Sequence, residues 1–270
     1  MAMTCVARAL APADLGCAQQ AGEKTVTVRD GWGAEATVKG FQEEHQAGSK
    51  WFIHDPERPQ PRAVEPGPSS TLGAKPPEGA VVLFDGRDAS GWTGGPWRIT
   101  DGHMEVNGTG NITSKAVFGD GYLHVEFAAP AEAKGAGQNR GNSGVFLMGR
   151  YEIQVLDSWK AATYADGMVG AVYGQNPPSV NASRPPGAWQ TYDITFTAPR
   201  FDEQGGVLSP ARVTVLLNGV TVQDDFKLLG PTRWRKPSSY QVHEPTGPVA
   251  LQDHGHPVRF RNIWFAPSKS

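Results

Sequence analysis

The sequence lacks several features that define common functional classes. It has two cysteines, Cys5 and Cys17, and both precede the first predicted strand, so the body of the protein can form neither a disulfide nor a thiol-based active site. It has no Lys/Arg-rich run, and its formal net charge is −2, which argues against a nucleic-acid-binding surface. No apolar run approaches the ~20 residues that a membrane-spanning helix needs.

Long segments with helical periodicity are also absent, whereas short alternating segments are frequent. From Val81 onward, roughly ten segments alternate apolar and polar residues, each bounded by Gly, Asn, Asp or Pro. The strongest hairpin signal is Asn218-Gly219 between Leu217 and Val220, because Asn-Gly is favoured in two-residue hairpin turns. These patterns predict an all-β fold, a jelly-roll sandwich of two antiparallel sheets.

The composition divides the chain into three regions. Residues 1–24 contain a short apolar patch that Asp14 interrupts, which fits either a degraded export signal or a disordered leader. Residues 25–80 combine a small hairpin, predicted over residues 24–41, with a proline-rich extended arm or linker. Residues 81–268 contain the predicted sandwich.

The segment NSGVFLMGRYEIQVLDSW, residues 142–159, contains polar residues at unusual places. In an extended strand, Tyr151, Ile153 and Val155 fall on one face. Glu152 and Gln154 fall on the other face, about 7 Å apart along the strand. We therefore predict a strand central in its sheet, with the apolar face buried and the Glu152 face turned either to solvent or to a ligand.

Five separated motifs occur in an order that resembles a known family. They cover Leu83–Trp92, Asn142–Trp159, Gly170–Ile194, Leu216–Phe226 and Ala250–Phe265. Together they resemble the bacterial 3-keto-disaccharide hydrolase domain family over about residues 81–267. The resemblance implies a concanavalin-like fold of two curved sheets, with a sugar site on the concave face. It also implies a periplasmic or secreted bacterial protein acting on glycosides whose 3-hydroxyl has been oxidised to a ketone.

A ketone at C3 changes what such an enzyme must supply. It acidifies the proton on C2, so loss of this proton can expel the C1 substituent, and water can then add. This route needs one general base near C2 and hydrogen-bonding groups near the C3 oxygen. Ordinary glycoside hydrolysis instead needs two carboxyl groups roughly 5–9.5 Å apart, and here Gln154 occupies the second position. Glu152 is the preferred base, with Asp157 and His254 as alternatives.

Further residues are candidates for substrate binding. Gln252 and His254 share one face of a predicted strand, and Arg259 and Arg261 share one face of the next. An arginine there could hold an enolate or sugar hydroxyls fork-wise, or be solvated. The long irregular segment 160–188 is predicted to wall one side of the cleft, because loops of this length in a compact β domain are usually functional. Tyr173 and Asn176 in this segment are candidates, as are Trp189, which directly follows it, and Asn142, which precedes the Ser143 strand.

Each of these candidates has an alternative interpretation. Trp189 could stack on a sugar ring or pack in the core, and Asn142 could bind a hydroxyl or set a turn. His254 and His256, with Asp253, could chelate a divalent cation, although the Gly-Pro context indicates a turn.

Two functional hypotheses follow from the sequence. The first is an enzyme that cleaves a 3-keto-glycoside, and the second is a non-catalytic lectin-like carbohydrate-binding module. Both use the same face and bind a sugar. The enzyme hypothesis requires a carboxylate or histidine in the cleft with a perturbed pKa, whereas the module requires only aromatic and amide groups.

Overall fold

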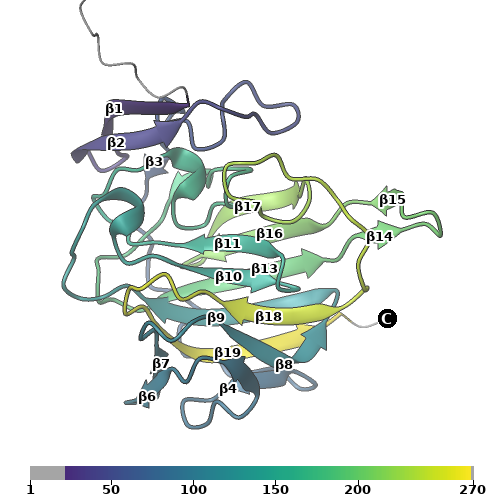
Figure 1. Ribbon diagram of the computed structural model, residues 1–270. Helices are drawn as coiled ribbons and strands as arrows, with labels where there is room; N and C mark the ends of the chain where they lie inside the picture. Colours follow the sequence, from purple (N-terminus) through teal and green to yellow (C-terminus); the bar gives the residue numbers. More distant parts are fainter. Residues whose placement is uncertain (1–21, 269–270) are drawn as a thin grey trace, which may run out of the picture.

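The computed structural model describes residues 22–268, which consist almost entirely of strands and loops (Figure 1). The two short 3-10 helices in this part of the chain are η1 (Gly137–Asn139) and η2 (Ala165–Gly167). Within residues 22–268, no helix has the length and apolar character needed to cross a membrane.

Two antiparallel sheets form the body of the molecule, one in front of the other in Figure 1. The smaller has the order β11 (Tyr151–Val155), β10 (Ser143–Leu147), β18 (Gly247–Leu251), β8 (Ile112–Phe118) and β5 (Trp92–Gly94). The larger has the order β17 (Val220–Lys227), β16 (Arg212–Leu217), β13 (Gln190–Thr197), β9 (Gly121–Ala128), β19 (Arg259–Pro267), β7 (His103–Glu105) and β6 (Arg98–Thr100), and β4 (Val81–Phe84) also pairs with β19. A small ribbon joins β14 (Arg200–Phe201) to β15 (Val207–Ser209). The predicted all-β, concanavalin-like sandwich is confirmed.

The core lies between the two sheets, where the apolar face of each alternating strand is buried. Tyr151, Ile153 and Val155 are fully buried, as predicted, and pack in one cluster with Tyr192 and Ile194 of β13. Burial of each large aliphatic side chain contributes about 1.5–3 kcal/mol. The hairpin predicted between Leu217 and Val220 is also confirmed, because Asn218 and Gly219 both have positive φ angles, 54° and 82°, as a type I′ turn requires.

The position predicted for β11 within its sheet is wrong. β11 is the outermost strand of the smaller sheet, and a loop covers its free edge. The backbone N–H groups of Gln154, Gly170 and Tyr173 complete hydrogen bonds of 3.0–3.2 Å across this edge. The sequence of β11 resembles that of a central strand because the loop buries its free edge as a neighbouring strand would.

The N-terminal region docks on this body at two places. The hairpin of β1 (Glu23–Arg29) and β2 (Glu35–Phe41) packs Val28 and Val38 against Ala162 and Tyr164 of the long loop. In the proline-rich arm, β3 (Arg62–Ala63) pairs in parallel with β12 (Val180–Asn181) as a separate two-stranded sheet, and Thr71 and Gly73 then hydrogen-bond to side chains of the larger sheet. The arm is therefore a packed segment and not a free linker. Residues 1–21 of the predicted leader lie outside the described residues.

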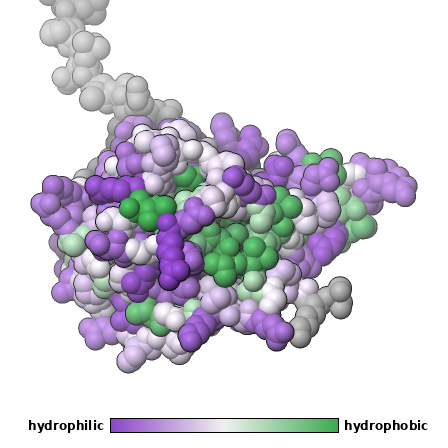
Figure 2. All heavy atoms as spheres, turned by 90° about the horizontal axis from the view of Figure 1, so that it is seen from below, coloured by the Kyte–Doolittle hydropathy of each residue, from purple (hydrophilic) through white to green (hydrophobic). Residues whose placement is uncertain are grey.

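Apolar side chains gather on one face of the body, seen in Figure 2 from below the view of Figure 1. The strands β4 and β8 lie in this lower part of Figure 1. They carry the exposed aliphatic residues Val81, Val82 and Val117. The hairpin β1–β2 is at the opposite end of the molecule in Figure 1.

Candidate functional site

A cavity of about 460 Å³ lies on the outer face of the smaller sheet, away from the core. The strands β10 and β11 form its floor, and the segment that follows β18 and the loops 156–179 and 228–246 contribute its walls. Six of the residues predicted from the sequence line this cavity: Asn142, Glu152, Gln154, Tyr173, Gln252 and His254. The fold therefore brings together residues that lie more than 100 positions apart in the chain.

Glu152 is a buried carboxyl group without a compensating charge. It is 4% exposed and Gln154 is 1% exposed, so the interpretation of this face as a solvent face is wrong. Burial raises the pKa of Glu152 to about 8. No Lys, Arg or His in residues 22–268 forms an ion pair with it. Its retention in such a place is costly unless a ligand uses it.

Gly144 provides the space that the Glu152 side chain occupies. Phe146 stands opposite Glu152 in the β10–β11 ladder and Gly144 stands opposite Gln154, so the Glu152 side chain leans diagonally across the neighbouring strand. A Cβ atom placed on Gly144 would lie 2.6 Å from Glu152 Oε1. The glycine of the NSGVF motif thus allows the carboxyl group to lie close to the floor of the cavity.

Three amide side chains line this cavity, those of Asn142, Gln154 and Gln252. The Asn142 Nδ2 donates to the Gln138 carbonyl at 2.8 Å, and the Gln154 Nε2 donates to Gln138 Oε1 at 3.0 Å and to the Gly167 carbonyl at 3.2 Å. These bonds fix the orientation of both amides. Asn142 Oδ1, Gln154 Oε1 and Gln252 Oε1 are buried without a hydrogen-bond partner. Such acceptors favour a ligand rich in hydroxyl groups.

His254 is the second titratable group with a shifted pKa in this cavity. Burial and the neighbouring His256, whose ring stacks at 5.6 Å, lower the pKa of His254. Because burial raises the pKa of Glu152 and lowers that of His254, the two pKa values are pushed apart, and near pH 7 the cavity contains a neutral imidazole and a largely protonated carboxyl group. Opposite shifts of this kind are typical of acid–base pairs in active sites.

Tyr173 adds a hydroxyl group to the cavity wall. Its Oη lies 3.1 Å from the Tyr164 Oη, and its ring packs against the His54 ring at 4.7 Å. His54 comes from the N-terminal arm and bonds to Asp166 through its backbone N–H at 2.9 Å. The arm therefore holds this wall in place from behind.

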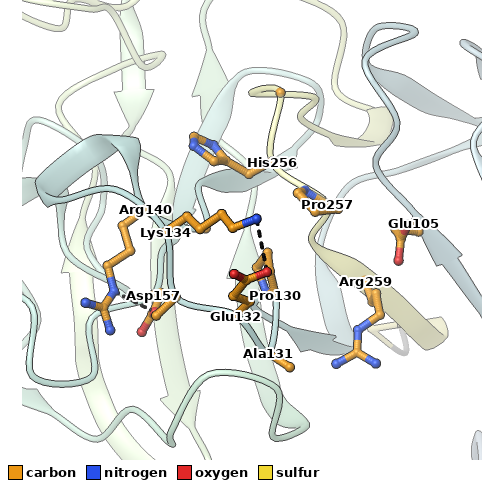
Figure 3. A pocket seen from close by; sticks show the side chains of 13 residues that line it. Glu105, Pro130, Ala131, Glu132, Lys134, Arg140, Asp157, His256, Pro257 and Arg259 are labelled. Atoms are coloured by element: carbon orange, nitrogen blue, oxygen red, sulfur yellow. Dashed lines mark hydrogen bonds and ion pairs between the residues drawn. The ribbon is translucent and has the colours of Figure 1, made fainter.

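Asp157 and Arg259 line a different cleft, of about 530 Å³, whose lining also includes His256 and Pro257 (Figure 3). Burial raises the pKa of Asp157, although Arg140, whose Nε lies 2.7 Å from Asp157 Oδ2, opposes this shift. Lys134 and Glu132 form another pair at 3.0 Å. The charged groups of this larger cleft largely neutralise one another, so it is the weaker candidate for chemistry.

Three other predicted residues also lie outside the Glu152 cavity. Asn176 Nδ2 donates to Gln223 Oε1 at 2.8 Å and belongs to the support of the loop. Trp189 packs under Arg261 at 4.0 Å, and the Arg261 Nε donates to Glu126 at 2.7 Å. Arg259 and Arg261 were expected near the site because their strand follows the Gln252 strand directly, but β19 belongs to the other sheet. The long loop thus contributes Tyr173 but not Asn176 to the cavity wall.

The alternative of a bound cation finds little support in this geometry. Within residues 22–268, no three His, Cys, Asp or Glu side chains are grouped as a metal site would require. The Asp253 carboxylate accepts hydrogen bonds from the backbone of Gly110 and Gly255, at 2.9 Å and 2.8 Å. Asp253 therefore shapes the turn, as the Gly-Pro context indicates.

Three residues of the cavity were not predicted: Phe146, Thr232 and Trp234. Thr232 and Trp234 belong to residues 228–246, an irregular segment between β17 and β18. Its length is itself a signal, because long loops in compact domains are often functional. The same argument that identified residues 160–188 would have identified this loop.

Comparisons with known proteins agree with this arrangement. Residues 79–266 match the family of the 3-keto-alpha-glucoside-1,2-lyase-like domain. The crystal structure of a candidate glycosyl hydrolase from Parabacteroides distasonis ATCC 8503 is 39% identical, with 84% of this chain and 100% of that chain covered and a TM-score of 0.71. A second one from the same organism is 20% identical, with 71% and 95% covered and a TM-score of 0.53; it supports the fold alone. No protein with a curated description matches the chain.

Proposed function

Because the chain belongs to the 3-keto-alpha-glucoside-1,2-lyase-like domain family, we propose that it is an enzyme that cleaves 3-keto-glycosides. Glu152 removes the proton from C2, and the electron pair of that C–H bond forms the C1–C2 double bond as the C1–O bond breaks. The leaving alcohol takes up a proton. Water then adds across the double bond, so the net reaction is hydrolysis of the glycosidic bond.

The observation that carries this proposal is the uncompensated Glu152 carboxyl group in a cavity lined by unpaired acceptors. A carboxylate with a pKa of about 8 is a stronger base than an ordinary glutamate, and a general base is most effective when its pKa lies near the working pH. The amide oxygens suit the hydroxyl groups of a sugar ring. Tyr173 and His254 line the same cavity and can donate hydrogen bonds to the C3 oxygen as negative charge develops on it.

The second candidate function is a lectin-like carbohydrate-binding module. The three amide acceptors favour it, because they are sufficient to bind a sugar. A binding module, however, gains nothing from a buried acid whose ionised form is destabilised, and a neutral glutamine would bind hydroxyl groups as well. The raised pKa of Glu152 therefore favours the enzyme.

The proposal is tested by incubating the purified protein with a 3-keto-glucoside and measuring release of the aglycone. We expect Glu152→Gln to lower turnover by about 10²–10⁴-fold, the usual contribution of a positioned base, with substrate binding nearly unchanged. Deuterium exchange at C2 should fall in parallel. The exposed acid Glu132 provides a control, since Glu132→Gln should turn over the substrate at the parent rate.

The pH dependence identifies the base. With Glu152 as the base, kcat/KM rises with pH up to about 8, because only the ionised carboxylate accepts the proton. With His254 as the base, kcat/KM would instead rise and reach its plateau at a lower pH, because the pKa of His254 lies below the ordinary histidine value of 6.5. A Glu152→Gln variant that turns over at the parent rate would exclude Glu152, and His254 or Asp157 would then be tested by His254→Gln and Asp157→Asn.

A further inference from the structure

A second cavity adjoins the one that contains Glu152. Its volume is about 450 Å³, and it shares Tyr173, Trp234 and His254 with the Glu152 cavity. Strand β2 of the N-terminal hairpin supplies one wall through Thr37, Val38, Lys39 and Phe41. The two cavities thus form one elongated cleft, and one end of it is built by residues outside the 79–266 family match.

Trp234 stands where the two cavities meet. Its side chain is 63% exposed, yet its surroundings hold it in place. The Phe41 ring meets it edge-on at 6.1 Å, and the Arg235 guanidinium lies 4.0 Å from the Phe41 ring and 5.1 Å from the Trp234 ring. Arg235 is in turn ion-paired with Glu43. An exposed indole that is held in this way is suited to stack on a ring of the ligand.

The hairpin wall is fixed against the rest of the protein. A Cβ atom on Gly40 would lie 2.3 Å from the His54 carbonyl oxygen, so β2 and the arm approach as closely as a glycine allows. The arm then carries His54 between the rings of Tyr164 and Tyr173, at 4.3 Å and 4.7 Å. The position of β2 is therefore coupled to Tyr173, which lines both cavities.

The polar groups of the second cavity match a second sugar ring. Thr37, Lys39 and Asn139 supply polar groups around it, and Lys39 also pairs with Glu23 at 2.8 Å, while Phe41 and Trp234 supply apolar surface. This combination of aromatic surface with a few polar groups is typical of ligand sites. It differs from the Glu152 cavity, where the unpaired groups are acceptors.

We propose that the second cavity is the subsite for the leaving group, which takes the second ring of a disaccharide while the oxidised ring lies over Glu152. The role as a leaving-group subsite rests on the proposed function, whereas binding of a second sugar ring in this cavity does not. The N-terminal hairpin then sets which leaving groups the enzyme accepts.

The test compares two substrates with one and two rings, methyl 3-keto-glucoside and a 3-keto-disaccharide. Thr37→Trp fills the second cavity, and we expect it to raise KM for the disaccharide at least about tenfold, the equivalent of ~1.4 kcal/mol. KM for the methyl glycoside should stay within about twofold. Lys39→Ala should show the same selectivity with a smaller effect. Thr25→Trp is the matched control, because Thr25 is exposed on β1 of the same hairpin and lines neither cavity.

Binding of unoxidised sugars separates this inference from the proposed reaction. Calorimetry with a disaccharide and with methyl glucoside requires no turnover. If no 3-keto-glycoside is cleaved but Thr37→Trp still abolishes disaccharide binding, the subsite stands and the proposed reaction fails. If the parent cleaves both substrates and Thr37→Trp changes neither KM, or changes both equally, the subsite is wrong.

Discussion

Two regions of the molecule that bury ionisable side chains differ in whether those side chains have charged partners. On the outer face of the smaller sheet, Glu152 lies among unpaired amide oxygens. On the larger sheet, beneath the N-terminal arm, His124 lies between two carboxylates. Its Nδ1 is 2.8 Å from Asp193 Oδ1, and its Nε2 is 3.7 Å from Glu126 Oε1.

The cluster around His124 is fully paired. Burial alone would lower the pKa of His124, but the hydrogen bond to Asp193 and the charge of the nearby Glu126 raise it above its ordinary value. Burial alone would raise the pKa of Glu126, but the nearby His124 and hydrogen bonds from Asn262, Gly73 and Arg261 lower it to about 2. In the Glu152 cavity no such bond opposes burial, and the pKa rises to about 8.

The paired cluster also holds the arm to the larger sheet. The Thr71 Oγ1 donates to Asp193 Oδ2 at 2.6 Å, and the Gly73 N–H donates to Glu126 Oε1. The Asn262 Nδ2 donates to the Ala74 carbonyl at 3.0 Å. The comparison teaches that a buried histidine between two acids is not by itself a catalytic sign. The paired charges around His124 attach the arm to the larger sheet, whereas the unpaired carboxyl group of Glu152 lies in the candidate active site.

The largest effect on stability is expected from breaking the paired cluster. Asp193→Asn removes the anion that bonds to His124, Tyr122 and Thr71, so the free energy of unfolding should fall by about 3–5 kcal/mol at pH 7. Urea unfolding measures this, and turnover per folded molecule should not change. Asp225→Asn breaks an exposed pair with Arg212 and serves as the control, with no measurable loss expected. A similarly small loss for Asp193→Asn would mean that the cluster does not hold the arm.

The opposite result is expected for the Glu152 cavity. The folded-state pKa of about 8 exceeds the ordinary value of 4.5, so the folded protein binds the proton more tightly and loses stability as pH rises from 4.5 to 8. Glu152→Gln removes this loss. The variant should therefore be more stable than the parent by about 2–4 kcal/mol above pH 8, with little difference near pH 4. Unfolding curves from pH 4 to 9 test this, and a variant less stable than the parent at pH 9 would contradict it.

A smaller effect is expected from Gly144→Ala, which displaces the Glu152 carboxyl group. The new methyl group would lie 2.6 Å from Glu152 Oε1 and 3.0 Å from Phe146 Cε2, and because the first is the flexible end of a side chain, the free energy of unfolding should fall by only about 1 kcal/mol. Turnover of a 3-keto-glucoside should fall about ten- to hundredfold, because small displacements of reacting groups are costly. Gly91→Ala is the control, since a Cβ atom there meets only the Leu83 carbonyl at 3.7 Å. Unchanged turnover in Gly144→Ala would show that the carboxyl group tolerates displacement.

The sequence predicted the sandwich because alternation of apolar residues reports directly which face of a strand is buried. It predicted Glu152 and Gln154 because polar side chains on an otherwise apolar strand need a reason, Tyr173 because it lies in a long loop, and Asn142, Gln252 and His254 because they lie at or beside strands of the same motifs. It placed β11 wrongly, because burial by a loop and burial by a neighbouring strand leave the same pattern. It also grouped Arg259 and Arg261 with Gln252, since adjacency in sequence does not reveal which of two sheets a strand joins.

The contribution of the N-terminal region was beyond what periodicity can reveal. The hairpin was visible in the sequence, but its contact with Tyr164 depends on packing between residues over 120 positions apart. The pairing of Glu126 with Arg261 is likewise long-range. Such contacts leave no local signal, so the coupling of the arm to the site emerges only in three dimensions.

The place of β19 in the larger sheet has a consequence for how the protein is made. β19 is the last strand in the described chain, yet it lies in the interior of its sheet, beside β9 and against β4 and β7. During synthesis, β4, β7 and β9 leave the ribosome long before the strand that joins them. The larger sheet can therefore close only after the final residues of β19 have emerged, so the chain must wait with open strand edges that can pair with other chains. Folding of the larger sheet thus waits for β19, and the open edges of β4, β7 and β9 need protection until this strand arrives.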